Sequence, residues 1–219
     1  MIRSRIRMRV AVTLLATLLP AALVAPGHAQ LSPAPTGSAP AASAPIPAQA
    51  LVAALRQGGL ILYFRHTATD FGQNDDSMTG YEDCARQRNL VDRGREDARR
   101  IGASIRRLDL PIGDVLASPF CRTLETARLI FGRATPTPAV RGGPARPESA
   151  ERYAELRALL ATAPRAGTDL VIVSHGNPFR AVTGTAYLAE GEAAVIRPLG
   201  ARGFEIVGRI TPSDWEGLH

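Results

Sequence analysis

Two histidines stand where a buried strand would end, and one of them adjoins an arginine. His66 follows the apolar run 60–64 and comes directly after Arg65. His175 follows a second apolar run, residues 170–173. Open α/β sheets bind their ligands beyond the carboxyl ends of the strands. We therefore expect both imidazoles to reach one pocket.

A third junction of this kind adds a second arginine. Residues 115–118 are typical of a strand, and the chain then turns directly into a helix predicted for 123–131. Arg122 stands at this turn. Arginine binds phosphate through a planar, bidentate fork, and the first turn of a helix attracts anions. Arg65 and Arg122 together predict a site for a phosphate group.

These side chains are suited to phosphoryl transfer. A neutral His66 can attack phosphorus as a nucleophile, and His175 as an imidazolium can stabilise charge on the phosphoryl oxygens. The leaving alkoxide then needs a proton from a carboxylic acid. We expect neither metal nor cofactor, since the arginines would repel a cation. A zinc or iron site is kept only as a minor alternative.

Three motifs, and the segment between the first two, resemble the histidine phosphatase superfamily, which has the phosphoglycerate mutase-like fold. The matching segments are residues 65–67, 88–94, 118–127 and 174–176. The similarity extends over roughly residues 60–210. It implies His66 as the nucleophile that accepts the phosphoryl group, and Arg65, Arg122 and His175 as the groups that clamp the phosphate.

The sequence leaves the general acid open. The phytase-like branch of the family has an aspartate directly after its second histidine, where this chain has Gly176 and Asn177. Mutase-like members use a glutamate after the second arginine, where Glu148 and Glu151 stand at a predicted exposed helix start. We favour Glu192, in a turn that enters a late strand. The other candidates are Glu190, Asp70 and Glu82.

The leading interpretation is an exported phosphomonoesterase that forms a phosphohistidine on His66. An exported member of this family resembles the lipopolysaccharide heptose-phosphate phosphatases, which implies a small phosphate ester as substrate, such as an envelope sugar phosphate. Two alternatives stay open: a phosphohistidine protein phosphatase, and a non-catalytic phosphate-binding or interaction domain of the same fold. A mutase is disfavoured because its substrate and cofactor are cytoplasmic.

The first residues predict export. Four arginines precede an apolar run over 10–25, and small residues at 27 and 29 offer a cleavage site after Ala29. We therefore expect a signal peptide over 1–29, a periplasmic or secreted product, and no membrane span after cleavage. A membrane anchor is disfavoured because the run is shorter than the ~20 residues of a span.

Charge and composition disfavour nucleic acid as a partner. All 26 basic residues are arginine, and four of them lie in the predicted signal, so the formal charge falls from +6 to +2 on cleavage. The chain also lacks a basic stripe with interleaved aromatic residues, which is the usual footprint of a nucleic-acid binder.

The remaining chain indicates one domain. Residues 30–47 are rich in proline, alanine and serine, carry no charge, and predict a disordered linker. Over 48–219, alternating helices and strands predict a three-layer α/β/α fold around a mainly parallel sheet. The predicted strands are 60–64, 115–118, 170–174, 193–198 and 203–210. The predicted helices are 48–57, 92–108, 123–131, 148–161 and one after residue 178.

A polar stretch over 67–88 predicts a long loop, and loops of this length inside a compact domain are usually functional. The loop contains Cys84, and the other cysteine, Cys121, adjoins Arg122. An exported chain meets an oxidising environment, which allows a disulfide between the two. Two separate, half-buried thiols are the alternative. The sequence does not predict the oligomeric state.

Overall fold

The computed structural model describes residues 46–142 and 150–219. The described residues belong to one compact unit, Ser43–His219. The predicted signal peptide and nearly all of the predicted linker lie outside the described residues. Within the described ranges, no helix combines the length and apolar character that crossing a membrane requires.

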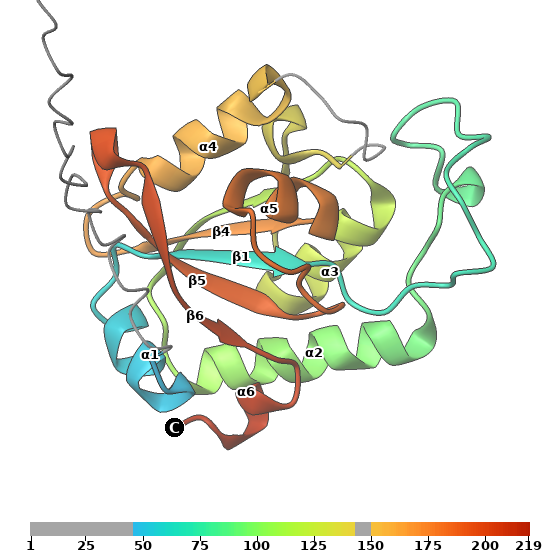
Figure 1. The fold of residues 1–219 in the computed structure, drawn as a ribbon. Coiled ribbons are helices and arrows are strands. Elements are labelled where there is room, and N and C mark those ends of the chain that lie inside the picture. Colours follow the sequence, from blue (N-terminus) through green and yellow to red (C-terminus); the bar gives the residue numbers. More distant parts are fainter. Residues whose placement is uncertain (1–45, 143–149) are drawn as a thin grey trace, which may run out of the picture. The chain divides into compact units, whose positions relative to one another are not determined.

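A six-stranded sheet forms the centre of the unit Ser43–His219 (Figure 1). Its spatial order is β3-β2-β4-β1-β5-β6. Four neighbouring strands, β3, β2, β4 and β1, run parallel, whereas β5 runs antiparallel to both β1 and β6. The strands are β1 (Ile61–Arg65), β2 (Ile112–Ala117), β3 (Thr135–Pro136), β4 (Asp169–Ser174), β5 (Ala193–Pro198) and β6 (Phe204–Ile210).

The central strands are buried on both faces, which is why their sequences are continuous apolar runs and not alternating patterns. In β1, Tyr63 lies opposite Ile172 of β4 on one side and Ala194 of β5 on the other. All three residues are completely buried. The parallel pairing of β1 with β4 brings the carboxyl ends of these two strands together.

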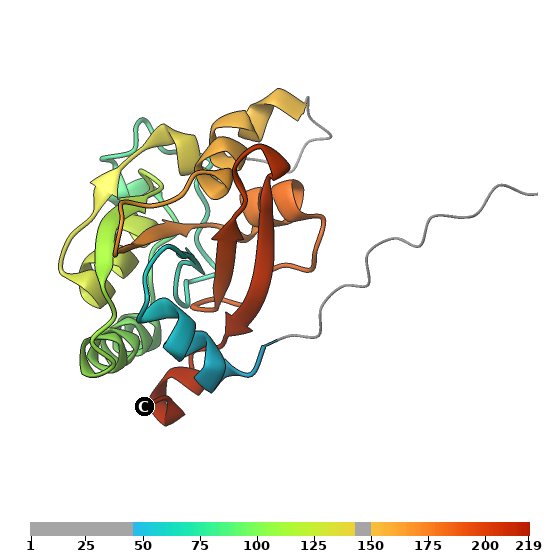
Figure 2. The same ribbon diagram turned by 90° about the vertical axis from the view of Figure 1, so that its left-hand side faces the viewer.

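Four helices cover one face of the sheet, as Figures 1 and 2 show. They are α1 (Ala48–Leu55), α2 (Asp92–Arg107), α3 (Cys121–Phe131) and α6 (Asp214–Gly217). In α2, Ala98, Ile101 and Ile105 recur at helical spacing and are buried. A Cβ at Gly102 would lie 2.6 Å from the carbonyl oxygen of Ile130, so this glycine allows α2 and α3 to pack closely.

Two helices, α4 (Ala154–Ala161) and α5 (Gly176–Thr183), cover the opposite face. Leu156 and Leu160 of α4 and Phe179 of α5 are completely buried there. The ring of Phe179 packs on that of Tyr63 in β1, with centroids 5.2 Å apart. The predicted three-layer α/β/α fold with a mainly parallel sheet is therefore confirmed.

Some element boundaries differ from those predicted. The first helix ends at Leu55 and not at residue 57, because the chain turns there into Gly58, which has a positive φ. Strand β2 begins at Ile112 and not at 115, since Ile112 already pairs with Asp169 ahead of a bulge. Residues 148–149, the predicted start of the fourth helix, lie outside the described residues. The chain beyond them forms a 3-10 helix and then α4.

The polar segment after β1 is a long loop, as predicted, and Figure 1 shows it at the right-hand side. An isolated bridge between Thr69 and Leu90 closes its base. Cys84, near its far end, forms a disulfide with Cys121, the first residue of α3. The loop is therefore covalently fastened to the residue that precedes Arg122.

Candidate active site

The carboxyl ends of β1, β4 and β2 meet at one pocket, because these strands are neighbours in the sheet. His66 follows β1 and His175 follows β4, and the centroids of their rings are 5.5 Å apart. Both rings line a pocket of about 660 Å³, together with Arg65 and Arg122. The structure thus brings together the two histidines and two arginines that the sequence analysis assigned to phosphate chemistry.

The His66 ring is held in one tautomer. Its Nδ1 lies 2.9 Å from the carbonyl oxygen of Thr67, and because a carbonyl only accepts, Nδ1 carries the proton. Nε2 therefore keeps its lone pair. Burial lowers the pKa of His66 well below its ordinary value, and the charges of Arg122 and Arg65 lower it further. The ring is accordingly neutral, as a nucleophile must be.

His175 is held at the start of α5. Its Nε2 lies 2.8 Å from the hydroxyl of Ser118, which follows β2, and its main-chain carbonyl accepts a hydrogen bond from Tyr63. Burial, and after it the charge of Arg122, lowers the pKa of His175 well below the ordinary value. The resting form is therefore neutral, whereas the sequence analysis expected an imidazolium. A bound phosphate dianion would supply the negative charge that the imidazolium requires.

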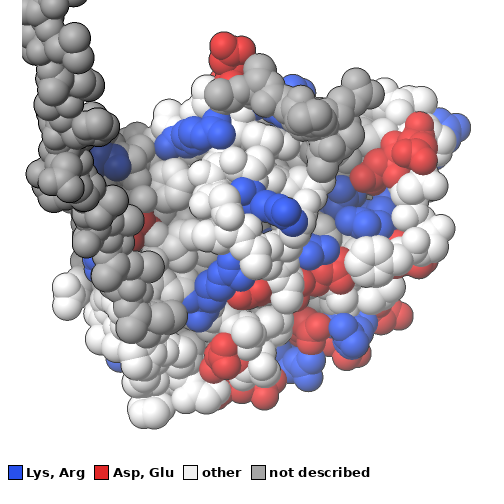
Figure 3. Space-filling view, in the orientation of Figure 1, with Lys and Arg blue, Asp and Glu red and all other residues white. Residues whose placement is uncertain are grey.

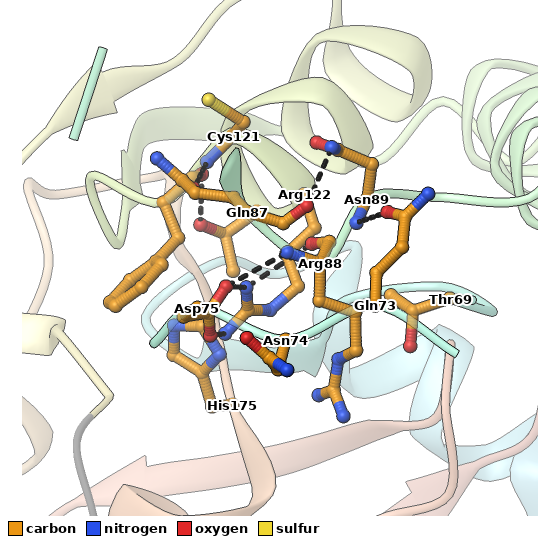
Figure 4. Close-up of polar contacts among 12 residues, drawn as sticks. Thr69, Gln73, Asn74, Asp75, Gln87, Arg88, Asn89, Cys121, Arg122 and His175 are labelled. Carbon is orange, nitrogen blue, oxygen red and sulfur yellow. Dashed lines mark hydrogen bonds and ion pairs between the residues drawn. The ribbon is translucent and has the colours of Figure 1, made fainter. Parts of the chain in front are cut away.

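Arg122 occupies the first turn of α3 and is 5% exposed. Its two terminal nitrogens donate to the two oxygens of Asp75 at 2.9 and 3.0 Å, a bidentate pair. Figure 4 shows the Asp75 carboxylate facing this fork, with His175 beside it. The guanidinium also stacks on the ring of Phe120, 4.6 Å from its centroid. Arg122 is thus rigidly presented to the pocket.

A third arginine, Arg88, also lines the pocket, and the sequence analysis gave it no role. Its guanidinium lies 5.0 Å from the ring centroid of Phe71, and its main-chain carbonyl accepts from Arg122. Arg88 belongs to the segment 88–94 that resembles the family. Its position at the end of a long polar loop was the one available signal, but no hydrophobic periodicity there predicts where the side chain lies.

The three pocket arginines share a further property. The Nε atoms of Arg65, Arg88 and Arg122 are buried and have no hydrogen-bond partner. Elsewhere in the described ranges, the buried side-chain polar atoms without a partner belong only to Asp169 and Trp215. Buried donors are normally paired. Three unpaired cationic donors around one pocket suit a ligand with several charged acceptor oxygens, such as phosphate.

Glu192, the favoured acid, does not line this pocket. It is 7% exposed, and its carboxylate accepts a hydrogen bond of 2.6 Å from the main-chain N–H of Ala189. The other carboxylate oxygen lies 3.5 Å from Arg209 of β6. The structure therefore gives the Glu192 carboxylate partners within its own turn and in the neighbouring strand.

Glu190 lies closer to the catalytic groups but also outside the pocket lining. It accepts a hydrogen bond of 2.6 Å from the hydroxyl of Thr69. One of its oxygens is 3.6 Å from a terminal nitrogen of Arg65 and 3.9 Å from Nδ1 of His66. Nδ1 is the protonated nitrogen of the ring. Glu190 therefore lies near Arg65 and on the Nδ1 side of the His66 ring, away from the nucleophilic Nε2.

The carboxylates that do line the pocket are Asp75 and Asp76, both from the long loop. Both fall within the predicted loop 67–88, and neither was among the predicted candidates for the acid. Figure 3 shows acidic and arginine side chains next to one another on the side of the molecule where the loop lies. Of the other candidates, Glu148 lies outside the described residues. The described ones absent from the lining are Asp70, Glu82 and Glu151.

The donor set of the pocket suits an anion better than a cation. Within residues 46–142 and 150–219, no three His, Cys, Asp or Glu residues form a group that could hold a metal ion. Three arginines stand at the same pocket and would repel a divalent cation.

Comparison with known proteins agrees with this geometry. The model of the histidine phosphatase superfamily (branch 1) matches residues 61–142, which include Arg65, His66 and Arg122. A search of curated proteins found no match. Residues 61–142 of this chain are therefore similar to the histidine phosphatase superfamily (branch 1).

Solved structures with a similar fold include two described as phosphatases and one described as a putative phosphatase. The protein histidine phosphatase SixA, complexed with tungstate, is 15% identical (TM-score 0.47) over 71% of this chain and 98% of its own. A putative phosphohistidine phosphatase SixA from Nakamurella multipartitia is 21% identical (TM-score 0.47) over 70% and 96%. A mycobacterial glucosyl-3-phosphoglycerate phosphatase is 16% identical (TM-score 0.47) over 63% and 89%.

Proposed function

We propose that this protein is a phosphomonoesterase that transfers the phosphoryl group of a small ester first to Nε2 of His66 and then to water. One observation carries the proposal. A neutral histidine with an unprotonated Nε2 shares a pocket with three arginines whose buried Nε atoms lack partners. A nucleophile and an anion clamp are the two parts that this reaction needs.

In the first half-reaction, the phosphate of the ester binds among Arg65, Arg88 and Arg122. His66 attacks phosphorus, the bond to the alkoxide breaks, and negative charge spreads over the three equatorial oxygens. Arginine donors that are already in place stabilise this charge without having to reorganise, which is usually the largest contribution to catalysis. His175, neutral at rest, can gain a proton beside the dianion and add a further donor.

In the second half-reaction, water attacks the phosphohistidine. The bond between phosphorus and Nε2 of His66 breaks, and the ring returns to its neutral tautomer, with Nδ1 still bonded to Thr67. The clamp stabilises this transition state as it does the first one. Inorganic phosphate then leaves.

We further propose a hydroxyl-rich ester, such as an envelope sugar phosphate, as substrate. The amide side chains of Gln73, Asn74 and Asn177 line the pocket and are suited to hydrogen-bonding hydroxyl groups. Export to the periplasm or beyond is part of the proposal. It is supported by the signal-like first residues and by the Cys84–Cys121 disulfide, since disulfides persist in oxidising compartments.

The test is turnover of p-nitrophenyl phosphate in the presence of EDTA. The wild-type protein should be active, and His66→Ala should lose at least ~100-fold in kcat, because no other group accepts the phosphoryl group. His219→Ala is the matched control and should match the wild type, since His219 is the exposed last residue. Rapid quenching should trap an acid-labile phosphoprotein in the wild type alone.

Three outcomes would redirect the proposal. Phosphate binding without turnover would indicate a non-catalytic phosphate-binding domain. Turnover of phosphohistidine that greatly exceeds that of sugar phosphates would favour the protein phosphatase. Activity that EDTA abolishes would indicate a metal mechanism.

A further inference from the structure

The proposed reaction leaves one group to be found, the acid that protonates the departing alkoxide. This acid must reach the pocket, and of the carboxylates in the described residues only Asp75 and Asp76 line it. Asp76 is exposed, at the rim. Asp75 is half-buried and lies against a member of the phosphate clamp.

The position of Asp75 is well defined. One carboxylate oxygen accepts from Arg122 at 2.9 Å and from the main-chain N–H of Arg88 at 2.9 Å, and the other accepts from Arg122 at 3.0 Å. Asp75 therefore touches both arginines that the loop and α3 contribute to the pocket. Figure 4 shows its carboxylate facing the Arg122 guanidinium and the main chain of Arg88, near His175.

A carboxylate and a phosphate compete for the same guanidinium fork, because both offer two oxygens at matching separation. When a phosphate enters this pocket, both terminal nitrogens of Arg122 are already hydrogen-bonded to Asp75. The phosphate carries more charge, and it can also engage the unpaired Nε donors of Arg65, Arg88 and Arg122. It is therefore the stronger ligand, and Asp75 is displaced from Arg122 while its loop still holds it in the pocket.

We propose that Asp75 is the general acid of the phosphatase reaction and that substrate phosphate prepares it by taking its place on Arg122. This inference rests on the proposed function. Once displaced, the carboxylate faces a phosphate dianion in place of a guanidinium, and neighbouring negative charge favours the protonated form. Asp75 then takes a proton from solvent at the moment when the proton is needed.

The proton balance is complete. As Nε2 of His66 bonds to phosphorus, the ester P–O bond breaks, and its electron pair, on the alkoxide oxygen, receives the proton of Asp75. The alcohol departs. The Asp75 carboxylate next accepts a proton from the attacking water, whose oxygen bonds to phosphorus as the P–N bond breaks. As phosphate leaves, Asp75 returns this proton to solvent, which replaces the one taken up at the start, and its carboxylate pairs again with Arg122.

Other contacts fix the loop around Asp75. The side chain of Gln73 accepts from the main-chain N–H of Asn89, and that of Gln87 accepts from the main-chain N–H of Cys121. The Cys84–Cys121 disulfide lies beside the latter contact. These anchors leave the carboxyl close to the phosphate site after Arg122 has released it.

The test compares two classes of substrate. Alkyl esters such as glucose 6-phosphate need a protonated leaving group, whereas p-nitrophenolate leaves without one. In single-turnover experiments, which isolate the first half-reaction, Asp75→Asn should lower the rate of alcohol release from alkyl esters by ~100-fold or more and leave the rate of p-nitrophenol release within about threefold of wild type. Inorganic phosphate should inhibit Asp75→Asn more strongly than wild type, because a neutral amide competes poorly for Arg122. The latter change distinguishes an acid held on Arg122 from a purely structural residue.

Asp114→Asn, at an exposed ion pair with Arg165, is the matched control and should behave as wild type. Asp76→Asn tests the neighbouring carboxylate. A selective loss on alkyl esters in Asp76→Asn and not in Asp75→Asn would overturn the inference. An equal loss on both substrate classes in Asp75→Asn with phosphate still bound, or no loss on either, would do so too. A wild-type protein inactive on every ester would overturn the proposed function itself.

Discussion

At the scale of single residues, the protonation states of the pocket histidines depend on burial and on the neighbouring charges. Burial and three nearby arginines keep His66 and His175 neutral, and the same arginines are the groups that attract the anion. The arginines that attract the anion therefore also keep the nucleophile His66 neutral. A substitution of one arginine should alter both phosphate binding and the state of the imidazoles.

Arg122 offers a direct test of geometry against charge. Arg122→Lys keeps the positive charge but loses the planar fork and the Nε donor, so kcat/KM should fall by ~100-fold or more. Steady-state kinetics on p-nitrophenyl phosphate measures this. Arg128→Lys, on the exposed side of the same helix, is the control. Activity close to wild type in Arg122→Lys would mean that Arg122 does not hold the phosphate.

At the scale of elements, the important unit is the long loop joined to α3. The loop contributes Asp75 and Arg88, and α3 contributes Arg122. The disulfide joins Cys84 to Cys121, which adjoins Arg122 in the sequence. Two parts of the site that come from separate elements are thus held together by one covalent bond.

Reduction of this bond should weaken both the fold and the activity. The cysteines are 37 residues apart, and the loop-entropy model then gives roughly 3 to 4 kcal/mol of lost stability. Thermal unfolding and turnover should be measured with and without dithiothreitol. A Cys84→Ser, Cys121→Ser double variant should have the melting temperature and turnover of the reduced protein. Dithiothreitol should change neither value in this variant. An unchanged melting temperature, or two titratable thiols in the native protein, would contradict the bridge.

At the scale of the whole unit, the two ends of β4 have different roles. Its carboxyl end leads to His175 and the pocket. Its first residue, Asp169, is completely buried: one carboxylate oxygen accepts from the main-chain N–H of Leu60 at 2.9 Å, and the other has no partner. Burial raises the pKa of Asp169 from 3.8 to about 7. The fold thus prefers this carboxyl in its neutral form.

The pKa of Asp169 makes the free energy of unfolding depend on pH, through the linkage between protonation and folding. Below the unfolded pKa of 3.8, Asp169 is protonated in both states and costs nothing. As the pH rises through about 7, the folded state must ionise a buried group, so this contribution to stability is lost. Asp169→Asn keeps the acceptor for Leu60 and cannot ionise. The variant should therefore gain stability relative to wild type as the pH rises from 5 to 8.

Urea unfolding at pH 5 and at pH 8 measures the difference in free energy of unfolding between Asp169→Asn and wild type. The comparison with wild type matters because the lowered pKa values of His66 and His175 act in the opposite direction, removing stability as the pH falls below 6.5. Asp114→Asn, at an exposed site, is the matched control for the substitution itself. A stability difference between Asp169→Asn and wild type that does not change with pH would contradict the argument.

The sequence by itself determined the framework and the chemistry of the strand ends. Continuous apolar runs can be satisfied only inside a sheet covered on both faces, and each run predicted a strand near its observed place. Parallel neighbours end at the same edge, so Arg65, His66, Arg122 and His175 could be expected to meet. Their residue types then indicated phosphate. The pairing of the two cysteines was allowed by the sequence but not decided by it.

Only the tertiary structure decided which carboxylates reach the pocket. Glu192 is near the catalytic loop in sequence, but its carboxylate is engaged by Ala189 and Arg209. Asp75 lies in a loop without periodicity, so no pattern indicates its direction. Its position depends on hydrogen bonds and a disulfide to residues far along the chain, among them Arg122 and Cys121. Such contacts exist only after the sheet has brought α3 beside the loop.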